Sequence, residues 1–412
     1  MKYVFSMTLA LALLASAPAL AEDIDVMTQN QYLGADLTPI VTAGDAAEFN
    51  AAVVAALEDV AANDFPARAH ALAELIARRL PALVGLQEVF TFTCMDLAPP
   101  TADQGCDNPR IRNAFNDHLA LTLAALADLE EDYSPVATVV NIDTTTVTIP
   151  PFPPGIPFFI DGVPALANII DHDVILVRGD LAGGAAPVDF TVFQHLGICT
   201  RPSADGCNYV VVATATLPDP DPDGTILNIE RGYVGVDVTV DGKDYRFIDT
   251  HLEVQEPQAG NELSAIVQAA QAQELIASLG PTTPAGSSLI VVGDINSSPD
   301  DPPIVVPEPL PPGFPPVIVP PYTQFVGLGY TDAWDGAPDD LPGFSCCQDD
   351  DLLNQQSSLV ERIDVIFSIE AWNKVKKARV LGAKVSDKTA PPDQGGLWPS
   401  DHGSVAAELQ FE

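Results

Sequence analysis

The sequence predicts an α/β fold, in which short buried strands alternate with amphipathic helices. The clearest strand is residues 289–292, a run of Leu, Ile and two Val that is typical of the centre of a sheet. Residues 45–60 and 66–80 have the spacing of two amphipathic helices and lie between the first two predicted strands, which gives a β-α-β beginning. Hydrophobic residues make up 47% of the 412 residues, so the chain can build a sizeable core and a disordered protein is excluded.

The remaining elements follow from apolar runs and from turn residues. Further strands are expected at residues 25–28, 83–89, 173–178, 209–216, 232–240, 245–250, 365–367 and 404–411. Further helices are expected at residues 107–129 and 262–279, the second ended by the Gly280-Pro281 pair. Asp241-Gly242 suits the tight turn of a hairpin.

Two Pro-rich stretches, near residues 146–164 and 299–322, are expected to be insertions. Residues 150–164 contain too many prolines for a regular strand or helix. The apolar side chains of these stretches either pack on the core or form exposed loops.

The amino terminus has the pattern of a secretory signal peptide over residues 1–21. Lys2 precedes an apolar run that continues to Leu14, and Ala19-Leu20-Ala21 forms a cleavage site before Glu22. The apolar run is too short to cross a bilayer, and no later stretch of about 20 apolar residues follows it. We therefore expect an exported protein, secreted or periplasmic, whose mature chain is residues 22–412.

The six cysteines fit an oxidising compartment. Two local disulfides are expected across loops that cysteines bracket, namely Cys94–Cys106 and Cys199–Cys207. Cys346 and Cys347 are adjacent, and three states stay open for them: a vicinal disulfide, pairing elsewhere, or free thiols. No CxxC pair accompanies them, which argues against a zinc site.

The chain is strongly acidic, with 57 Asp and Glu against 18 Lys and Arg and a formal net charge of −39. Such a surface repels the phosphate backbone of nucleic acids at low ionic strength, which disfavours a nucleic-acid partner. Adaptation to a saline habitat explains the same acidity and leaves nucleic acid open. No feature of the sequence indicates an obligate protein partner.

Polar side chains stand where several predicted strands end or begin. After strand 289–292, Gly293 allows a sharp turn. Asp294 and Asn296 then leave the strand end on the same side, because side chains alternate along a strand. The other strand-end clusters contain Asn30, Glu88, His251, Asp364 and the pair Asp401-His402.

In order along the chain, these clusters read T-x-N, Q-E-V, T-H-L, G-D-x-N, R-I-D and S-D-H, between Asp25 and Phe411. This order resembles the endonuclease/exonuclease/phosphatase superfamily, whose members have the DNase-I-like fold. The resemblance implies one catalytic domain over residues 22–412, built as a four-layer α/β/β/α sandwich with two packed mixed sheets. One departure is Gln31, where a larger apolar residue is commoner in that family.

The resemblance also implies a divalent-metal site. Glu88 is the expected ligand of Mg²⁺, or of Mn²⁺ or Ca²⁺, since Mg²⁺ takes a carboxylate at a strand end while it keeps several waters. Asn30 is expected to help position the metal or the phosphate, and Asp401 to lie beside the metal. His172 is not expected to form a metal chelate with its neighbours Asp171 and Asp173, because adjacent side chains on a strand point to opposite faces.

Five residues are expected to carry the catalysis. Asp294 would orient or deprotonate the attacking water, and Asn296 would donate to a phosphate oxygen. His402 would contact the phosphate as an imidazolium held by Asp364, since a carboxylate partner favours the charged ring. His251 is the candidate acid or phosphate ligand opposite, with a structural role as the alternative.

The expected function is that of an exported, metal-dependent phosphoesterase. The favoured substrate is a small or lipid-linked phosphodiester, as in sphingomyelinase-like enzymes, because the Pro-rich stretches carry apolar side chains that could reach a membrane surface without spanning it. These side chains are Phe152, Phe158, Phe159, Ile160 and those of residues 314–319. A secreted DNase-I-like nuclease is the alternative. A catalytically silent binding protein on the same fold is the alternative of another class, which the complete set of polar positions disfavours.

Overall fold

The computed structural model describes residues 23–99, 102–218, 224–255, 263–306, 316–337, 342–369, 372–390 and 395–411. The predicted signal peptide, residues 1–21, and Phe314 of the second Pro-rich stretch lie outside these residues. Within the described ranges, no helix is both long enough and apolar enough to cross a membrane.

The first sheet contains eight strands of the described chain. Their order is β19-β20-β1-β2-β6-β3, and β4 and β5 also pair with β6. Their bounds are β1 Asp23–Asn30, β2 Leu83–Gln87, β3 Thr91–Asp96, β4 Tyr133–Asp143, β5 Ile156–Ile160, β6 Val163–Arg178, β19 Trp372–Leu381 and β20 Ser404–Phe411. β1 and β2 run parallel, and the helices between them form the predicted β-α-β crossover.

The second sheet also contains eight described strands. Their order is β17-β18-β14-β13-β12-β9-β8, and β7 pairs with β12. Their bounds are β7 Ala186–Pro187, β8 Pro202–Ser203, β9 Gly206–Asn208, β12 Gly232–Val240, β13 Lys243–His251, β14 Ser288–Asp294, β17 Thr331–Asp332 and β18 Asp364–Ser368. β13 and β14 run parallel, and the predicted Asp241-Gly242 turn, with φ of 51° and 87°, joins β12 to β13.

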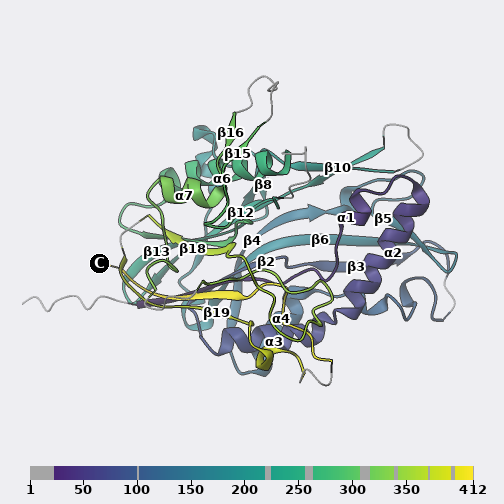
Figure 1. Ribbon diagram of the computed structural model, residues 1–412, viewed down its shortest axis with the longest axis horizontal. Coiled ribbons are helices and arrows are strands. Elements are labelled where there is room, and N and C mark those ends of the chain that lie inside the picture. The colour runs from purple at the N-terminus through teal and green to yellow at the C-terminus, as the bar shows by residue number, and fades with distance from the viewer. Residues whose placement is uncertain are drawn as a thin grey trace, which may run out of the picture.

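The two sheets pack face to face, and helices cover both outer faces (Figure 1). Buried aliphatic and aromatic side chains fill the space between the sheets, such as Val26 and Leu83 from the first and Phe247 and Val292 from the second. α3 Phe65–Ala77 and α4 His118–Asp128 pack on the first sheet, and α6 Leu263–Thr282 and α7 Pro321–Gly327 pack on the second. The predicted four-layer α/β/β/α sandwich with two packed mixed sheets is confirmed.

α1 Thr38–Val41 and α2 Ala46–Ala62 cover the end of the first sheet that β3 and β5 form. Asp45 caps α2, because its side chain accepts the N–H groups of Ala47 and Glu48 at 2.8 and 2.9 Å. The buried guanidinium of Arg68 in α3 donates to the carbonyl oxygens of Gln31 and Tyr32 at 2.7 and 3.0 Å. These bonds fix the loop that follows β1.

Two short ribbons and several single turns complete the described chain. The ribbons are β10 Ala213–Leu217 with β11 Thr225–Ile229, and β15 Ile304–Val305 with β16 Val317–Ile318. The short helices are α5 Gly179–Ala182, η1 Gly105–Asp107, η2 Arg112–Ala114, η3 Thr144–Thr146, η4 Phe190–Leu196 and η5 Val385–Asp387. The strand expected at residues 209–216 begins only at Ala213 and lies in the first ribbon.

Two predicted helix limits are wrong. The helix expected at residues 107–129 begins only at His118, because Pro109 interrupts the segment and Asn and Asp side chains bond to the local backbone instead. Asn108 accepts the N–H of Arg110 at 3.0 Å, for example. The second helix, α6, continues past Gly280-Pro281 to Thr282, whose hydroxyl donates to the Ser278 carbonyl at 2.8 Å.

The expectation that residues 150–164 form neither strand nor helix is also wrong. Ile156–Ile160 is strand β5, and it pairs only with β6 among the described strands. An edge strand tolerates a proline such as Pro157, whose missing N–H removes a bond from the exposed side at most. Phe158 and Ile160 are buried in the core, whereas Phe159 is 44% exposed. Ile156, Phe158 and Ile160 therefore cover the core, whereas Phe159 and, in the second stretch, Val317 and Val319 are exposed.

The predicted disulfides Cys94–Cys106 and Cys199–Cys207 are both present, with Cα atoms 5.8 and 5.4 Å apart. Cys346 is paired with Cys347, which selects the vicinal disulfide from the three states left open.

Peptide mass spectrometry of the unreduced protein is expected to recover Cys94 joined to Cys106 and Cys199 joined to Cys207. Each crosslink closes a short loop and contributes up to roughly 3 kcal/mol by restricting the unfolded chain. A reduced and alkylated sample is the control. Alkylated thiols at all four positions in the unreduced sample would contradict the pairing.

Candidate active site

Polar side chains from both sheets meet at the ends of the two parallel strand pairs. Asn30 is the last residue of β1 and Glu88 follows β2, so the parallel pairing of these strands brings the two side chains to one edge. In the second sheet His251 ends β13 and Asp294 ends β14, and the two are register partners. The contacts described below connect these four residues to the other predicted site residues, which are Asn296, Asp364, Asp401 and His402.

The backbone before Asp294 is fixed by a close approach of two strands. β14 continues through Gly293, which therefore does not turn the chain as the sequence indicated. A Cβ atom at Gly293, where φ is 142°, would lie 1.9 Å from the carbonyl oxygen of Thr250 in β13. Only glycine fits this position, and it allows the strand to carry Asp294 directly beside His251.

Asp294 is the central carboxylate of the site and is 1% exposed. Its Oδ1 accepts the backbone N–H of Asn296 at 2.9 Å, and its Oδ2 accepts Nδ2 of Asn30 at 3.2 Å. Burial raises the pKa of Asp294 to about 7, although the nearby charge on His402 opposes the increase. A carboxylate with this pKa can exchange a proton near neutral pH.

His402 and Asp364 form the predicted imidazole-carboxylate pair. Nδ1 of His402 lies 2.8 Å from Oδ2 of Asp364, and its Nε2 lies 3.7 Å from Oδ2 of Asp294. Burial by itself would lower the pKa of His402, but Asp364, Asp401 and Asp294 outweigh that effect and hold the pKa well above its ordinary value. The ring is therefore an imidazolium at neutral pH.

Glu88 is held in one orientation by two donors. Its Oε2 accepts the backbone N–H of Leu33 at 2.8 Å, and its Oε1 accepts Nδ2 of Asn30 at 3.1 Å. Oδ1 of Asn30 accepts the N–H of Tyr32 at 2.9 Å, which fixes the orientation of the amide. The Asn30 amide nitrogen thus joins the carboxylates of Glu88 and Asp294, one from each sheet.

Glu88 and Asp401 fit a hard divalent cation. Both carboxylates are half-buried. Burial raises the pKa of Asp401 to about 6; the charge on His402 opposes this increase, and the charge on Glu88 adds to it. A divalent cation would relieve this repulsion, and carboxylate oxygens are the ligands that Mg²⁺ prefers.

A second group of candidate ligands fits a metal less well. The candidate ligand atoms of Asp294, Asp364 and His402 lie within 4.8 Å of one another. A metal bound here would have to displace the contact between Nδ1 of His402 and Oδ2 of Asp364, which lie 2.8 Å apart. The sulfurs of Cys346 and Cys347 also lie within 4.8 Å of a His402 nitrogen, but they are joined to each other and are not thiolates. Asp294, Asp364 and His402 therefore suit proton handling better, and the Cys346–Cys347 pair suits a structural role.

His251 is buried and lies against Arg231, a residue that the sequence did not single out. NH1 of Arg231 is 2.9 Å from Nδ1 of His251. Because a guanidinium only donates, Nδ1 accepts and the ring proton lies on Nε2. Burial, Arg231 and the charge on His402 hold the pKa of His251 well below its ordinary value. His251 is thus neutral, which suits a hydrogen-bond donor to phosphate better than a general acid.

Nε2 of His251 faces the strand-end pair. Of its two neighbours, Oδ2 of Asp294 at 3.6 Å can accept the Nε2 proton, whereas Nδ2 of Asn296 at 3.2 Å is itself a donor. Asn296 has a φ of 49° and donates to the Leu252 carbonyl at 3.0 Å, which holds its amide beside the imidazole. The predicted placement of Asp294 and Asn296 on one side of the strand end is therefore observed.

Three buried aspartates behind the site were also missed. Asp171 and Asp173 lie on β6 and Asp249 lies on β13, and all three are fully buried between the sheets. Oδ2 of Asp171 lies 3.9 Å from NH1 of Arg231, and burial raises the pKa of Asp171 to about 7. Burial, followed by the charge on Asp171, raises the pKa of Asp173 well above its ordinary value, and burial does the same for the pKa of Asp249. The i, i+2 spacing of Asp171 and Asp173 on a strand is the signal that could have identified this inward-facing pair.

Replacing Asp364 with Asn is expected to lower the pKa of His402 by about one to three pH units, since an opposite charge at hydrogen-bond distance has an effect of that size. The imidazolium then loses its proton at lower pH, so the alkaline limb of a kcat/KM profile moves to lower pH. NMR titration of the imidazole nitrogens in metal-free protein measures the pKa directly.

Glu361→Gln, at an exposed position three residues earlier, is the matched control for this charge removal. An unchanged His402 pKa in Asp364→Asn would contradict the pairing.

No family model matches the sequence, and no curated protein matches it. Among solved structures, the chain is similar to an endonuclease/exonuclease/phosphatase from Beutenbergia cavernae, with 18% identity, a TM-score of 0.46, and coverage of 94% of this chain and 72% of that one. A mannosyl-6-phosphatase from Bacteroides thetaiotaomicron matches with 16% identity, a TM-score of 0.46, and coverage of 94% and 100%. An endonuclease/exonuclease/phosphatase family protein from Leptotrichia buccalis matches with 13% identity, a TM-score of 0.44, and coverage of 94% and 100%.

These identities and TM-scores give no information on the substrate or activity of this chain. The matches extend over about 94% of its length, and the structures matched include proteins described as endonuclease/exonuclease/phosphatase.

Proposed function

We propose that the chain is a divalent-metal-dependent phosphoesterase of the endonuclease/exonuclease/phosphatase type. The observation that carries the proposal is the Asn30 amide nitrogen, which lies 3.1 Å from Oε1 of Glu88 and 3.2 Å from Oδ2 of Asp294. It ties a carboxylate suited to a metal to a carboxylate suited to accept a proton. Hydrolysis of a phosphate ester needs both a metal and a proton acceptor, because the anionic phosphate repels the attacking oxygen.

Asp294 is the proposed general base. It is buried, its pKa is about 7, and each of its oxygens accepts one hydrogen bond from an amide of the site. Such a carboxylate takes a proton from water more readily than an exposed one, and the fixed amides keep it in one orientation.

Three neighbouring side chains are the proposed phosphate ligands. The His402 imidazolium brings a positive charge, the neutral His251 offers its Nε2 proton, and the Asn296 amide offers a further donor. Donors fixed before the substrate arrives stabilise the charge that develops on the phosphate oxygens without further reorganisation. Asp364 orients His402, and Arg231 orients His251.

Glu88 and Asp401 would hold the metal, with Asn30 positioning Glu88. When bound, a divalent cation such as Mg²⁺ would supply positive charge that offsets the charge on the phosphate. The two carboxylates already lie close enough for the charge of Glu88 to raise the pKa of Asp401, which supports this assignment.

The favoured substrate is a phosphodiester that is small or linked to a lipid, hydrolysed outside the cytoplasm. The net charge of −39 disfavours a polyanion such as duplex DNA, and three disulfides agree with an exported protein. The membrane contact expected from the first Pro-rich stretch loses support, because Phe158 and Ile160 are buried. A secreted nuclease and a silent binding protein remain the competing functions.

A hydrolysis screen separates these functions. DNA, RNA, sphingomyelin, phosphatidylcholine and nitrophenyl phosphodiesters are tested with and without Mg²⁺. Turnover of nitrophenyl diesters or phospholipids, with DNA at low salt left intact, supports the favoured substrate. Efficient DNA cleavage without activity on the other esters supports the nuclease, and no turnover of any ester supports the binding protein.

A further inference from the structure

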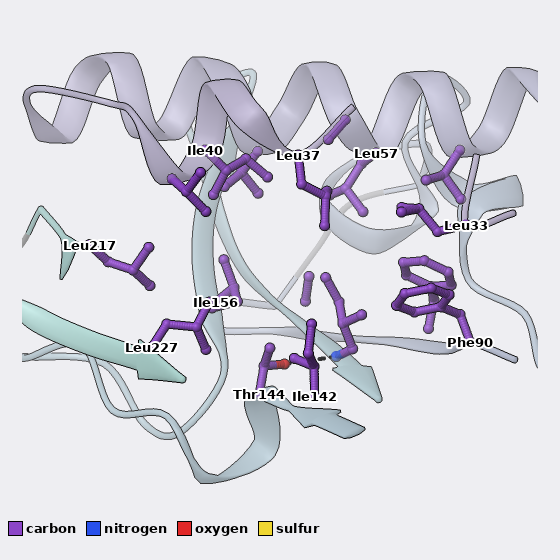
Figure 2. A pocket seen from close by; sticks show the side chains of 17 residues that line it. Leu33, Leu37, Ile40, Leu57, Phe90, Ile142, Thr144, Ile156, Leu217 and Leu227 are labelled. Carbon is purple, nitrogen blue, oxygen red and sulfur yellow. Dashed lines mark hydrogen bonds between the residues drawn. The ribbon is translucent and has the colours of Figure 1, made fainter. Parts of the chain in front are cut away.

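An apolar pocket lies under helices α1 and α2 (Figure 2). Its volume is about 70 Å³. Its walls come from the loop after β1, from both helices, and from strands β3 to β6, β10 and β11. Figure 2 shows Leu33 and Phe90 at one end of the pocket and Leu217 and Leu227 at the other.

The pocket offers no hydrogen bond to a ligand. Every lining residue is apolar except Thr144, and the Thr144 hydroxyl oxygen already accepts the N–H of Ile169 at 2.8 Å. A polar group placed there would lose its bonds to water without replacement, whereas a hydrocarbon would lose nothing. The pocket therefore selects for apolar groups in a protein whose surface is strongly acidic.

One end of the pocket is built from residues that hold the candidate metal ligand. Leu33 lines the pocket, and its backbone N–H donates to Oε2 of Glu88 at 2.8 Å. Phe90 lines the same end, and its N–H donates to the Glu88 carbonyl oxygen at 3.1 Å. A ligand in the pocket would thus contact Leu33, whose N–H binds the Glu88 carboxylate, and Phe90, which follows Glu88 by two residues.

The lower wall is connected to the site as well. Ile142 lines the pocket, and the adjacent Asn141 donates to Oδ2 of Asp171 at 3.3 Å. Asp171 in turn lies 3.9 Å from the Arg231 guanidinium that orients His251. Ile142 and Leu227 are only half-buried, as are Leu33, Leu37 and Ile40 of the opposite wall. These half-buried side chains, spread along both walls, mark where the pocket is nearest to solvent, and together they are called its mouth.

We propose that this pocket binds the hydrocarbon part of the substrate, such as an alkyl or acyl chain, while the ester phosphate lies at the active site. The inference rests on the proposed phosphoesterase function and names the substrate class more closely: a phosphodiester with one alkyl arm. Apolar residues of the first Pro-rich stretch contribute through Ile156, which lines the pocket rather than facing a membrane.

Methyl, butyl and octyl 4-nitrophenyl phosphates, used below their aggregation limits with Mg²⁺ present, test this proposal. Each methylene that enters an apolar site raises kcat/KM by about three- to fourfold. We expect at least a tenfold increase from the methyl to the butyl ester, with a smaller gain per methylene beyond it as the pocket fills.

Ala56→Phe fills the pocket from α2 and is expected to remove most of the preference for butyl over methyl ester. Leu37→Trp, at the half-buried mouth, fills the pocket without changing a core position and serves if Ala56→Phe does not fold. Ala51→Phe is the matched control, since it adds the same ring to the exposed face of the same helix. The control should keep the preference.

Binding of methyl and butyl phosphate to metal-free protein, measured by calorimetry, gives a readout that does not need turnover. The expected result is tighter binding of butyl phosphate, which Ala56→Phe or Leu37→Trp abolishes. Hydrolysis of all three esters at equal rates would overturn the pocket assignment and leave the phosphoesterase standing. Absence of hydrolysis would count against the phosphoesterase, and equal affinity for the two phosphates would then overturn the pocket assignment independently.

Discussion

Asp294→Asn is expected to reduce kcat by about 10²- to 10⁴-fold, the usual loss when a general base is removed. The substitution preserves the shape of the side chain and an acceptor for the Asn296 N–H, but the amide cannot take a proton. The Asn30 amide also loses its charged partner, so the bond between the two sheets weakens. Initial rates on a nitrophenyl phosphodiester, together with circular dichroism, measure activity and folding separately.

Asp300→Asn is the matched control, because Asp300 is exposed in the loop that follows the same strand. A near-normal rate for Asp294→Asn, with a native spectrum, would return Asp294 to a structural role.

His402→Ala is expected to lower kcat by about 10²- to 10⁴-fold, roughly 3 to 5 kcal/mol of transition-state stabilisation. It removes the imidazolium that Asp364 orients and leaves the Asp364 carboxylate buried without its partner. Added imidazole should restore part of the rate, since it can occupy the space that the side chain leaves. A residue that merely supports the fold would show no such rescue.

His70→Ala, on the exposed side of α3, is the control and should keep full activity. Loss of activity in His402→Ala that no imidazole concentration restores, together with a changed circular dichroism spectrum, would favour a structural role.

The strand ends were predictable because each strand has a strong local pattern. Residues 289–292 are continuously apolar and residues 404–411 are mostly apolar, and polar residues follow or precede these runs within two residues. Since strands fix the direction of successive side chains, the position of Asp294 could be derived two residues beyond the run. Asn296 lies outside the strand with a φ of 49°, and its bonds to Asp294 and Leu252 place it instead. The pairing of Asp364 with His402 came from the family resemblance, and the structure contains that contact.

Arg231 could not be found from local pattern. It stands one residue before β12, outside the strand-end motifs. Its role follows from its contact with His251, which lies 20 residues later in the chain. Asp171 and Asp173 were hidden for the opposite reason. They stand in an acidic chain, where an aspartate is usually a surface residue, so their i, i+2 spacing places them on one face of β6 but the packing of the second sheet decides that this face is buried.

The wrong start of the helix at residues 107–129 and the unexpected strand at residues 156–160 have a shared physical cause. Apolar periodicity predicted a helix at residues 107–129, but Pro109 and Asn108 favour local turns over helix. Proline count excluded strand at residues 150–164, but an edge position removes most of the cost of a proline. In both segments the contacts with neighbouring elements decide the secondary structure, and the local sequence does not show those contacts.

The central claim is metal-dependent hydrolysis of a phosphodiester, and the rate on a nitrophenyl diester in EDTA, before and after Mg²⁺ is restored, tests it most directly. EDTA should abolish turnover of the wild-type protein, excess Mg²⁺ should restore it, and Glu88→Gln should need a higher Mg²⁺ concentration while keeping its fold. Undiminished turnover in EDTA would contradict the claim.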